Sequence, residues 1–149
     1  MPALSRDLDW IGIMTYDYHG HWDKQTGHVA PLYLHSESDT VYYNANYTIN
    51  YYIRLGADPK KLIMGIPLYG QSFTLTDRKN NGLNAPTTGP GTAGQFTRQG
   101  GFLAYYEVYI FTYLSLFKIR KLNSCKEVLI ENKINGNKTG LIVSIQYNH

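Results

Sequence analysis

Two short runs of apolar residues stand out along the chain, and each predicts a buried strand. The first spans Leu8 to Tyr16 and the second spans Leu62 to Pro67. Both contain few polar side chains, which is typical of parallel strands that are covered on both faces. The pattern therefore predicts an α/β fold with a parallel sheet.

A helix is predicted between the two strands, because the apolar positions there recur at helical spacing. These positions are Tyr42, Ala45, Ile49, Tyr52 and Ile53. Ser38 or Asp39 is the expected N-cap, and Gly56 is the expected stop. A strand, a crossover helix and a second strand make a right-handed βαβ unit.

Polar and aromatic residues follow both predicted strands at the point where each strand ends. Tyr16, Asp17 and Trp22 follow the first, whereas Tyr69 and Gln71 follow the second. Ligands bind beyond the carboxyl ends of strands in α/β barrels and open parallel sheets. Aromatic faces stack on sugar rings, and phenols and carboxylates bind hydroxyl or amide groups, so a carbohydrate site is one interpretation.

The same residue types also occur in ordinary protein cores. On that second interpretation Met14 and Tyr16 are core residues and Trp22 anchors a loop. The spacing by itself leaves both interpretations open. A loop of 22 residues from Asp17 to Ser38 favours the first interpretation, because structureless connections longer than about 12 to 15 residues are usually functional or disordered.

Residues 74–99 are rich in Gly, Asn, Thr and Pro, which predicts turns in place of a core element. A helix is expected to start over Gly100 to Glu107. A helix that follows so long an irregular segment suggests an inserted subdomain.

The composition narrows the possible partners. The chain has 149 residues, a net charge of +3, 43% hydrophobic residues and 14 tyrosines. It has no basic face dense enough to indicate nucleic acid binding. The amino terminus lacks the apolar core of a signal peptide, and no run reaches the ~18 apolar residues of a membrane span. The single Cys125 excludes an internal disulfide.

From Trp10 to Val108 the sequence resembles an internal piece of a glycoside hydrolase family 18 chitinase of the insect or arthropod type. Four stretches carry the resemblance, in the order and spacing of the family: residues 14–20 (Met-Thr-Tyr-Asp-Tyr-His-Gly), 22–33, 64–73 (Met-Gly-Ile-Pro-Leu-Tyr-Gly-Gln-Ser-Phe) and 101–107 (Gly-Phe-Leu-Ala-Tyr-Tyr-Glu).

The resemblance implies an α/β fold that is part of a (β/α)8 TIM barrel. Residues 1–73 would supply the sixth strand, the sixth helix and the seventh strand, and residues 74–108 would begin the α+β chitinase insertion domain. The family cleaves β-1,4-linked N-acetylglucosamine polymers with retention, and the acetamido oxygen of the substrate is the nucleophile. The implied partner is chitin or a chito-oligosaccharide, with no cofactor and no metal.

The resemblance also implies a role for each residue that matches a family motif. Tyr16 and Tyr69 would hold the acetamido group, Met14 would line the floor beneath the distorted sugar, and Asp17 would bind sugar polar groups. Trp22 would stack on a sugar on the leaving side. Gln71 stands where many relatives carry an arginine that contacts sugar hydroxyls. All six residues are expected to bind substrate.

One family motif is absent from these 149 residues. The catalytic acid of the family sits in the pattern Asp-x-x-Asp-x-Asp-x-Glu, and neither Asp7 nor Asp9 has an acidic residue at the required offsets. General acid catalysis typically supplies about 10²- to 10⁴-fold in rate. We therefore expect that this chain does not hydrolyse chitin on its own.

The resemblance ends after Val108. Residues 109–149 contain no Ala, Asp, Pro, Met or Trp and carry six basic against two acidic residues. Ile, Asn, Lys, Leu, Phe and Tyr dominate them, as in translated A- and T-rich DNA, so a translated intron is one interpretation. An amphipathic element with Phe111, Leu114 and Phe117 at helical spacing is the other.

Two smaller signals concern metal binding and glycosylation. His19, His21, His28 and His35 match no common zinc spacing, so no metal site is expected. Asn46-Tyr47-Thr48 and Asn137-Lys138-Thr139 are N-glycosylation sequons, which matter only in a secreted chain. Asn46 is the candidate acceptor, since it lies in the predicted helix at a position expected to be exposed.

Three functional hypotheses follow from the sequence. The chain is a part of an active chitinase, or a chitin-binding or decoy module without catalysis, or a truncated product without a stable fold. The family resemblance predicts an extracellular location.

Overall fold

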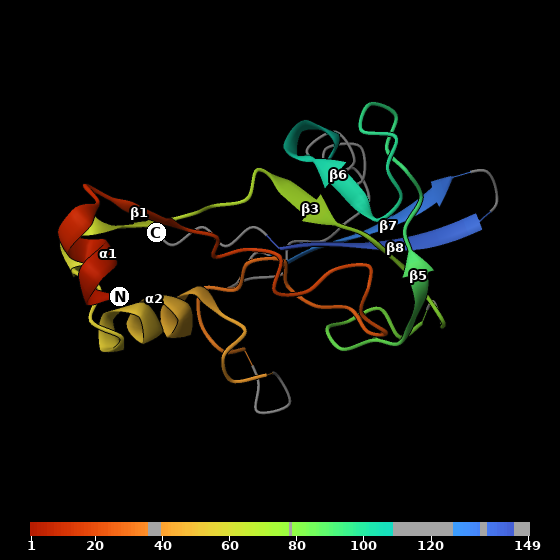
Figure 1. Ribbon diagram of the computed structural model, residues 1–149. Helices are drawn as coiled ribbons and strands as arrows, with labels where there is room; N and C mark the ends of the chain where they lie inside the picture. Colours follow the sequence, from red (N-terminus) through yellow and green to blue (C-terminus); the bar gives the residue numbers. More distant parts are fainter. Residues whose placement is uncertain (36–39, 78, 109–126, 135–136, 145–149) are drawn as a thin grey trace. The chain divides into compact units, whose positions relative to one another are not determined.

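The computed structural model describes residues 1–35, 40–77, 79–108, 127–134 and 137–144, the last two ranges by their backbone alone (Figure 1). Contacts divide the chain into two compact units. The first contains residues 1–18 and 30–67, and the second contains residues 19–29 and 68–149. Each unit is described by itself.

The first unit contains the predicted strand, helix and strand. Strand β1 (Ile11–Ile13) pairs in parallel with strand β2 (Leu62–Met64), and helix α2 (Ala45–Arg54) lies between them in the sequence. The register places Ile11 opposite Leu62 and Ile13 opposite Met64. The prediction of a parallel β-α-β arrangement is therefore confirmed.

Both strands are shorter than predicted. β1 ends at Ile13, because the Thr15 N–H turns back to the Ile13 carbonyl oxygen at 3.0 Å and removes Met14 to Tyr16 from the ladder. The Gly65 N–H still reaches the Ile13 oxygen at 2.8 Å. Further along the chain, Pro67 has no N–H and cannot donate a hydrogen bond to a neighbouring strand.

Helix α2 starts later than predicted. Its N-cap is Asn44, whose side chain accepts a hydrogen bond from the Tyr47 N–H at 2.8 Å, so Tyr42 precedes the helix. Ser38 and Asp39, the predicted caps, lie outside the described residues. The helix does stop at Gly56, which adopts a positive φ of 89°, and the N–H groups of Gly56 and Ala57 return to the carbonyl oxygens of Ile53 and Tyr52.

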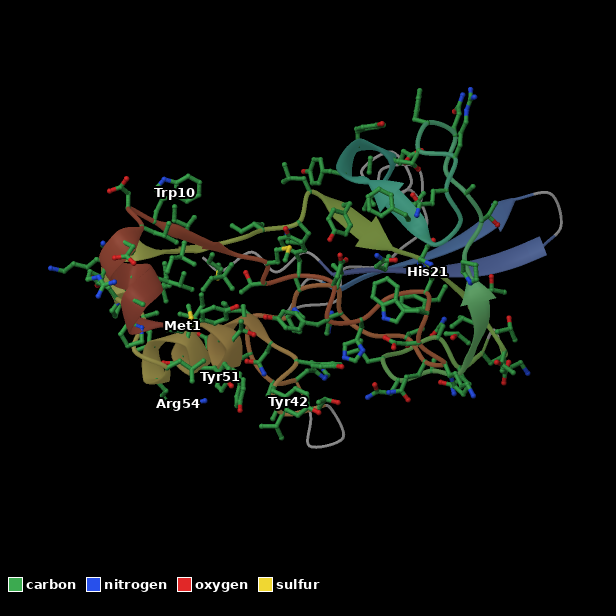
Figure 2. All side chains as sticks on the ribbon, viewed as in Figure 1. Met1, Trp10, His21, Tyr42, Tyr51 and Arg54 are labelled. Atoms are coloured by element: carbon green, nitrogen blue, oxygen red, sulfur yellow. The ribbon has the colours of Figure 1, made fainter. Side chains whose placement is uncertain are left out.

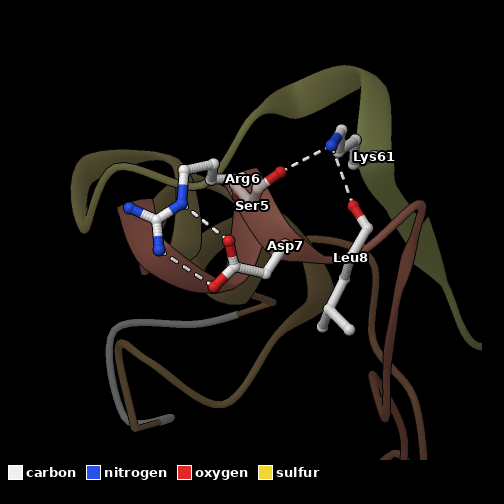
Figure 3. A network of polar contacts seen from close by, with 5 residues as sticks. All are labelled: Ser5, Arg6, Asp7, Leu8 and Lys61. Carbon is white, nitrogen blue, oxygen red and sulfur yellow. Dashed lines mark hydrogen bonds and ion pairs between the residues drawn. The ribbon is translucent and has the colours of Figure 1, made fainter.

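A short helix that the sequence analysis did not predict precedes β1. Helix α1 (Pro2–Asp7) is joined to the 3₁₀ turn η1 (Pro59–Lys61) through Lys61, as Figure 3 shows. The Lys61 ammonium donates to the carbonyl oxygens of Ser5 and Leu8 at 2.5 and 2.8 Å, and the Ser5 hydroxyl accepts from the Asp58 N–H at 2.9 Å. These bonds fix the chain entering β2 to the chain entering β1.

The second unit is a set of short antiparallel pairings. Strand β3 (Tyr69–Gln71) pairs with β6 (Phe102–Ala104), and β4 (Phe73–Leu75) pairs with β5 (Thr87–Pro90). A hairpin of β7 (Glu127–Ile134) and β8 (Asn137–Ser144) adds to β4, giving the order β5-β4-β8-β7. Phe73 is fully buried in this unit.

Two predictions for residues 74–107 are wrong. Residues 74–99 do more than turn, because β4 and β5 form a ladder there. Residues 100–104 are not helical, because Gly101 takes a positive φ of 80° and Phe102 to Ala104 pair with β3. Helical backbone starts at residue 105. Phe111, Leu114 and Phe117 lie outside the described residues.

Candidate functional site

The carboxyl ends of β1 and β2 are joined by Thr15 and by the predicted site residue Tyr16. The Thr15 hydroxyl donates to the Gly65 carbonyl oxygen at 2.6 Å, and Thr15 is only 1% exposed. The Tyr16 ring lies against Gly65, where an added Cβ would come within 2.7 Å of the ring. Any side chain at position 65 would therefore collide with the Tyr16 ring.

Met14 and Asp17 flank Tyr16 at this end of the sheet. Met14 is 75% exposed, and Asp17 is exposed with a positive φ of 58°. Such a backbone conformation is uncommon for residues other than glycine, although Asp and Asn adopt it more readily than most. Strain of this kind is often found at binding sites. An apolar thioether, a phenol and a carboxylate thus lie within four residues directly after β1, interrupted only by the buried Thr15.

In the second unit, the buried Gln71 pairs with His21, which is partly exposed. Gln71 is 4% exposed, and its amide oxygen lies 3.1 Å from His21 Nδ1. An amide oxygen can only accept, so this bond requires a proton on Nδ1. Gly101 also packs against His21, since any Cβ there would collide with the imidazole ring.

Trp22 is positioned by the same histidine. The two rings meet edge to face with centroids 5.3 Å apart, and Trp22 remains 54% exposed. A side chain at Gly20 would collide with the indole. The exposed indole face is therefore held in a defined orientation and is available to a ligand. Figure 2 labels His21 among the side chains of this unit.

Tyr69, the remaining candidate, packs against Phe102. Their ring centroids lie 4.8 Å apart across the β3 and β6 pairing, and Tyr69 is partly exposed. The six candidate residues thus divide between the two units: Met14, Tyr16 and Asp17 belong to the first, and Trp22, Tyr69 and Gln71 belong to the second.

The predicted binding loop is held in place over residues 19–29. The Thr26 hydroxyl donates to the Gly82 carbonyl oxygen at 2.7 Å and accepts from the Ala85 N–H at 3.0 Å, and Thr26 is fully buried. Asp23 accepts from the Gly20 N–H and bonds His19 Nδ1, both at 3.1 Å. This part of the loop is therefore an ordered support for Trp22.

Glu107 is a buried carboxylate to which the sequence analysis gave no role. It is 2% exposed and accepts hydrogen bonds from the N–H groups of Phe96, Thr97 and Ala104 and from the Thr97 hydroxyl, at 2.7 to 3.1 Å. Burial raises the pKa of Glu107, but these hydrogen bonds outweigh it and the net pKa is lowered. Glu107 is thus an ionised structural anchor for residues 96–104.

His21 and Glu107 were missed because their partners are distant in sequence. One signal was present in each case, namely a glycine. Gly101 faces His21, and a Cβ on Gly94 would collide with the Glu107 carboxylate. A glycine cannot by itself reveal which side chain fills its space.

The described residues contain no group of three or more His, Cys, Asp or Glu side chains that could hold a metal ion. None of the helices in the described ranges has the length and apolar character needed to cross a membrane.

Comparison with known proteins identifies the family. The model of "Glycosyl hydrolases family 18" matches residues 1–139. Probable chitinase 10 of Drosophila melanogaster is 63% identical over 108 residues, which is 72% of this chain and 5% of that protein. The oviduct-specific glycoprotein of Sus scrofa is 47% identical over 108 residues, or 72% of this chain and 20% of that protein.

Solved structures give the same result. The second catalytic domain of Ostrinia furnacalis Group II chitinase, as a mutant in complex with penta-N-acetylchitooctaose, is 43% identical with a TM-score of 0.76, covering 94% of this chain and 36% of that one. Human YKL-39, described as a pseudo-chitinase with retained chitooligosaccharide binding, is 36% identical with a TM-score of 0.76, covering 96% and 39%.

The chain therefore spans a small part of the curated relatives and somewhat over a third of these solved ones. Their fold is of the TIM-barrel type, and this chain has the mixed helix and strand content of a part of it. The chain belongs to glycosyl hydrolase family 18 and is similar to a part of arthropod-type chitinases.

Proposed function

We propose that this chain forms part of the chitin-binding cleft of a family 18 chitinase and that, by itself, it binds β-1,4-linked N-acetylglucosamine chains without cleaving them. The family match and the oligosaccharide bound to the Ostrinia relative support the ligand class. On this proposal the parent protein is secreted and hydrolyses its substrate with retention, through the acetamido group of the substrate.

The arrangement at the end of β1 supports the binding role most directly. Tyr16 is held against Gly65 by the close fit of its ring, and Asp17 follows it in a strained conformation with an exposed carboxylate. Holding a phenol and a carboxylate in advance lowers the entropy lost when a ligand binds. We assign Tyr16 to the acetamido group, Met14 to the floor under the sugar ring and Asp17 to sugar polar groups.

The second unit carries its own candidate ligand-binding residues. The exposed indole of Trp22 offers a flat apolar face for a sugar on the leaving side, and Tyr69 offers a partly exposed phenol. Gln71 has a smaller role than the sequence suggested. Its amide oxygen is engaged with His21 and its side chain is 4% exposed, so we infer that it acts on the ligand mainly by positioning His21 and Trp22.

Catalysis is outside the proposed role of the chain. The acidic motif that supplies the proton in this family is absent from the 149 residues. Glu107 does not replace it, because that carboxylate is buried and its lowered pKa keeps it ionised near neutral pH, whereas a general acid must carry a proton.

The proposal also specifies where the chain belongs in the complete fold. We infer that β1, α2 and β2 are the sixth strand, sixth helix and seventh strand of a (β/α)8 barrel, and that residues 74–108 begin the insertion domain. A translated intron is the proposed source of a non-family tail at residues 109–149, although the family match extends to residue 139.

A non-catalytic binding module is the second candidate. It is favoured by one relative, human YKL-39, which is described as a pseudo-chitinase that retains chitooligosaccharide binding. The two candidates share the same binding residues and differ in whether a longer product supplies the acidic motif. Full-length transcript sequencing across residue 108 and upstream of Met1 separates them.

The binding role is tested by retention on chitin beads. We expect the intact chain to be retained, and Trp22→Ala to weaken binding about tenfold, which corresponds to about 1.4 kcal/mol. Tyr16→Phe should weaken it about two- to tenfold through one lost hydrogen bond. Trp10→Ala is the matched control, because Trp10 is also exposed, at 65%, but has no assigned ligand contact.

Equal retention of all four proteins would refute the binding role. Circular dichroism of the same samples shows whether each is folded. A parent chain without a cooperative melt would instead support the third hypothesis, a truncated product that has no stable fold.

A further inference from the structure

A cavity of about 430 Å³ lies beside helix α2 in the first unit, and its lining contains none of the residues assigned to substrate. Its lining includes Tyr33, Asn46, Tyr47, Asn50 and Arg54. The volume lies within the ~300 to 1,000 Å³ that is usual for small-molecule pockets. The full lining combines two tyrosine rings, three asparagine amides, two aliphatic side chains and a guanidinium, which is a chemistry suited to sugars.

Asn46 is the residue of this cavity that carries a modification signal. It begins the sequon Asn46-Tyr47-Thr48 and is exposed in the first turn of α2. Its amide oxygen and its backbone carbonyl oxygen both accept from Asn50 Nδ2, at 3.1 and 2.8 Å. Within the described part of the chain Asn46 Nδ2 has no hydrogen-bond partner, so the atom that would carry a glycan is exposed at the edge of the cavity.

The aromatic wall next to Asn46 is pre-organised. The rings of Tyr47 and Tyr51 are nearly parallel, at 12°, with centroids 6.2 Å apart. The Arg54 guanidinium lies over both rings, 5.3 Å from the centroid of Tyr47 and 6.0 Å from that of Tyr51. Figure 2 shows Tyr51 and Arg54 on the same helix. Arg54 makes no ion pair with any described residue, so its N–H groups are available to sugar oxygens.

We propose that Asn46 carries an N-linked glycan whose first sugars occupy this cavity and pack against Tyr47. In the modifying step, Asn46 Nδ2 forms a bond to the anomeric carbon of the first N-acetylglucosamine of a lipid-diphosphate-linked oligosaccharide. The bond from that carbon to the diphosphate oxygen breaks, the lipid diphosphate leaves, and the amide releases one proton.

A tethered sugar fits this cavity better than a free one. Attachment at the rim gives the sugar a high effective concentration, so that weak stacking and a few hydrogen bonds suffice. The inference depends on the proposed function only for the secretory route, because this modification occurs in secreted chains. It makes no use of Tyr16, Asp17 or Trp22.

Occupancy is tested by secreting the full chain from insect cells behind a signal peptide and mapping glycopeptides by mass spectrometry. The second sequon at Asn137 is mapped separately in the same digest. We expect a glycan on Asn46 in the parent chain and in Thr48→Ser, which keeps the sequon and the hydroxyl, and none in Asn46→Gln. A secreted parent chain with an unmodified Asn46 would overturn the proposal.

Packing is tested by a thermal double-mutant cycle of Asn46→Gln and Tyr47→Ala. In secreted protein, loss of the glycan should lower the melting temperature by about 2 to 4 °C, the shift usual for a chain of this size when one modest interaction is lost. That shift should disappear in the Tyr47→Ala background and persist in the Tyr106→Ala background, because Tyr106 is an exposed tyrosine of the second unit that does not line the cavity. Additive shifts would refute packing on Tyr47.

The same cycle in bacterial protein, which carries no glycan, should show no such coupling. Chitopentaose binding to that bacterial protein distinguishes a free ligand from the tethered one. If Tyr47→Ala reduces binding there as strongly as Trp22→Ala does, the cavity takes free sugar and the proposal is wrong. We expect retention on chitin beads to require Trp22 and not Tyr47 or Asn46. This result would show that chitin binding and glycan packing are independent of each other.

Discussion

The Glu107 carboxylate accepts a hydrogen bond from the Phe96 N–H at 2.7 Å, 11 residues earlier in the chain. Thr97 and Ala104 donate to the same carboxylate. The Glu107 side chain therefore joins the loop before β6 to Ala104, the last residue of β6. Glu107 thus connects three residues of a segment that contains little regular structure.

Glu107→Gln should destabilise the chain by about 1 to 3 kcal/mol, because an amide replaces a charged acceptor and offers one oxygen to four donors. Asp9→Asn is the control, since Asp9 is an exposed acidic residue. Urea unfolding of both variants against the parent gives the difference. Equal midpoints would show that the Glu107 contacts contribute nothing measurable to stability.

The same residue predicts a loss of stability in acid. The pKa of Glu107 is lowered from its ordinary value of 4.5 in the folded chain, so the unfolded chain binds the proton more readily. Its contribution is complete above pH 4.5 and declines as the pH falls through the lower folded pKa. Melting temperatures measured from pH 7 to pH 3 should fall less steeply for Glu107→Gln than for the parent. Parallel curves would contradict this assignment.

Gly101→Ala should destabilise the second unit and disturb Trp22. The residue has a positive φ of 80°, and its new Cβ would collide with His21. We expect a loss of about 2 to 4 kcal/mol, within the range for backbone strain combined with overpacking. Gly82→Ala is the control, because nothing lies within 4 Å of a Cβ there. The tryptophan fluorescence maximum should shift in Gly101→Ala and not in Gly82→Ala. If it shifts in neither variant, His21 does not position Trp22.

Asn44→Ala should cost about 0.5 to 2 kcal/mol, the usual range for loss of an N-cap. It removes the bond from the Tyr47 N–H at 2.8 Å and the bond that its own amide donates to Val41 at 2.9 Å. Asn50→Ala, at an exposed position of the same helix, should be close to neutral because alanine favours the helix. Thermal melts followed by helical circular dichroism test the pair. Equal effects would mean that Asn44 does not cap α2.

The β-α-β order was predictable because it depends on local patterns. Apolar runs at residues 8–16 and 62–67 and the glycine after Leu55 are visible in the sequence. The element ends were less predictable. The sequence pattern favours Ser38 or Asp39 over Asn44 as the helix cap, and β1 ends early through a backbone bond between Ile13 and Thr15 that no side chain signals.

The candidate site was predicted as a set of residues and not as a set of contacts. Tyr16 and Trp22 follow from strand ends and from the resemblance. The contact between Gln71 and His21 joins residues 50 positions apart, so the sequence pattern does not predict it. The strand at Phe102 to Ala104 was mistaken for a helix, because its pairing with β3 depends on residues more than 30 positions away, which local periodicity cannot reveal.

The central claim is that the chain binds chitin chains without cleaving them. The most direct measurement is incubation of the folded chain with chitohexaose, with binding followed by calorimetry and chain length by mass spectrometry in the same sample. The account predicts saturable binding that Trp22→Ala weakens, and full-length hexaose after prolonged incubation. Shortened oligosaccharides, or binding that is unchanged in both Trp22→Ala and Tyr16→Phe, would contradict it.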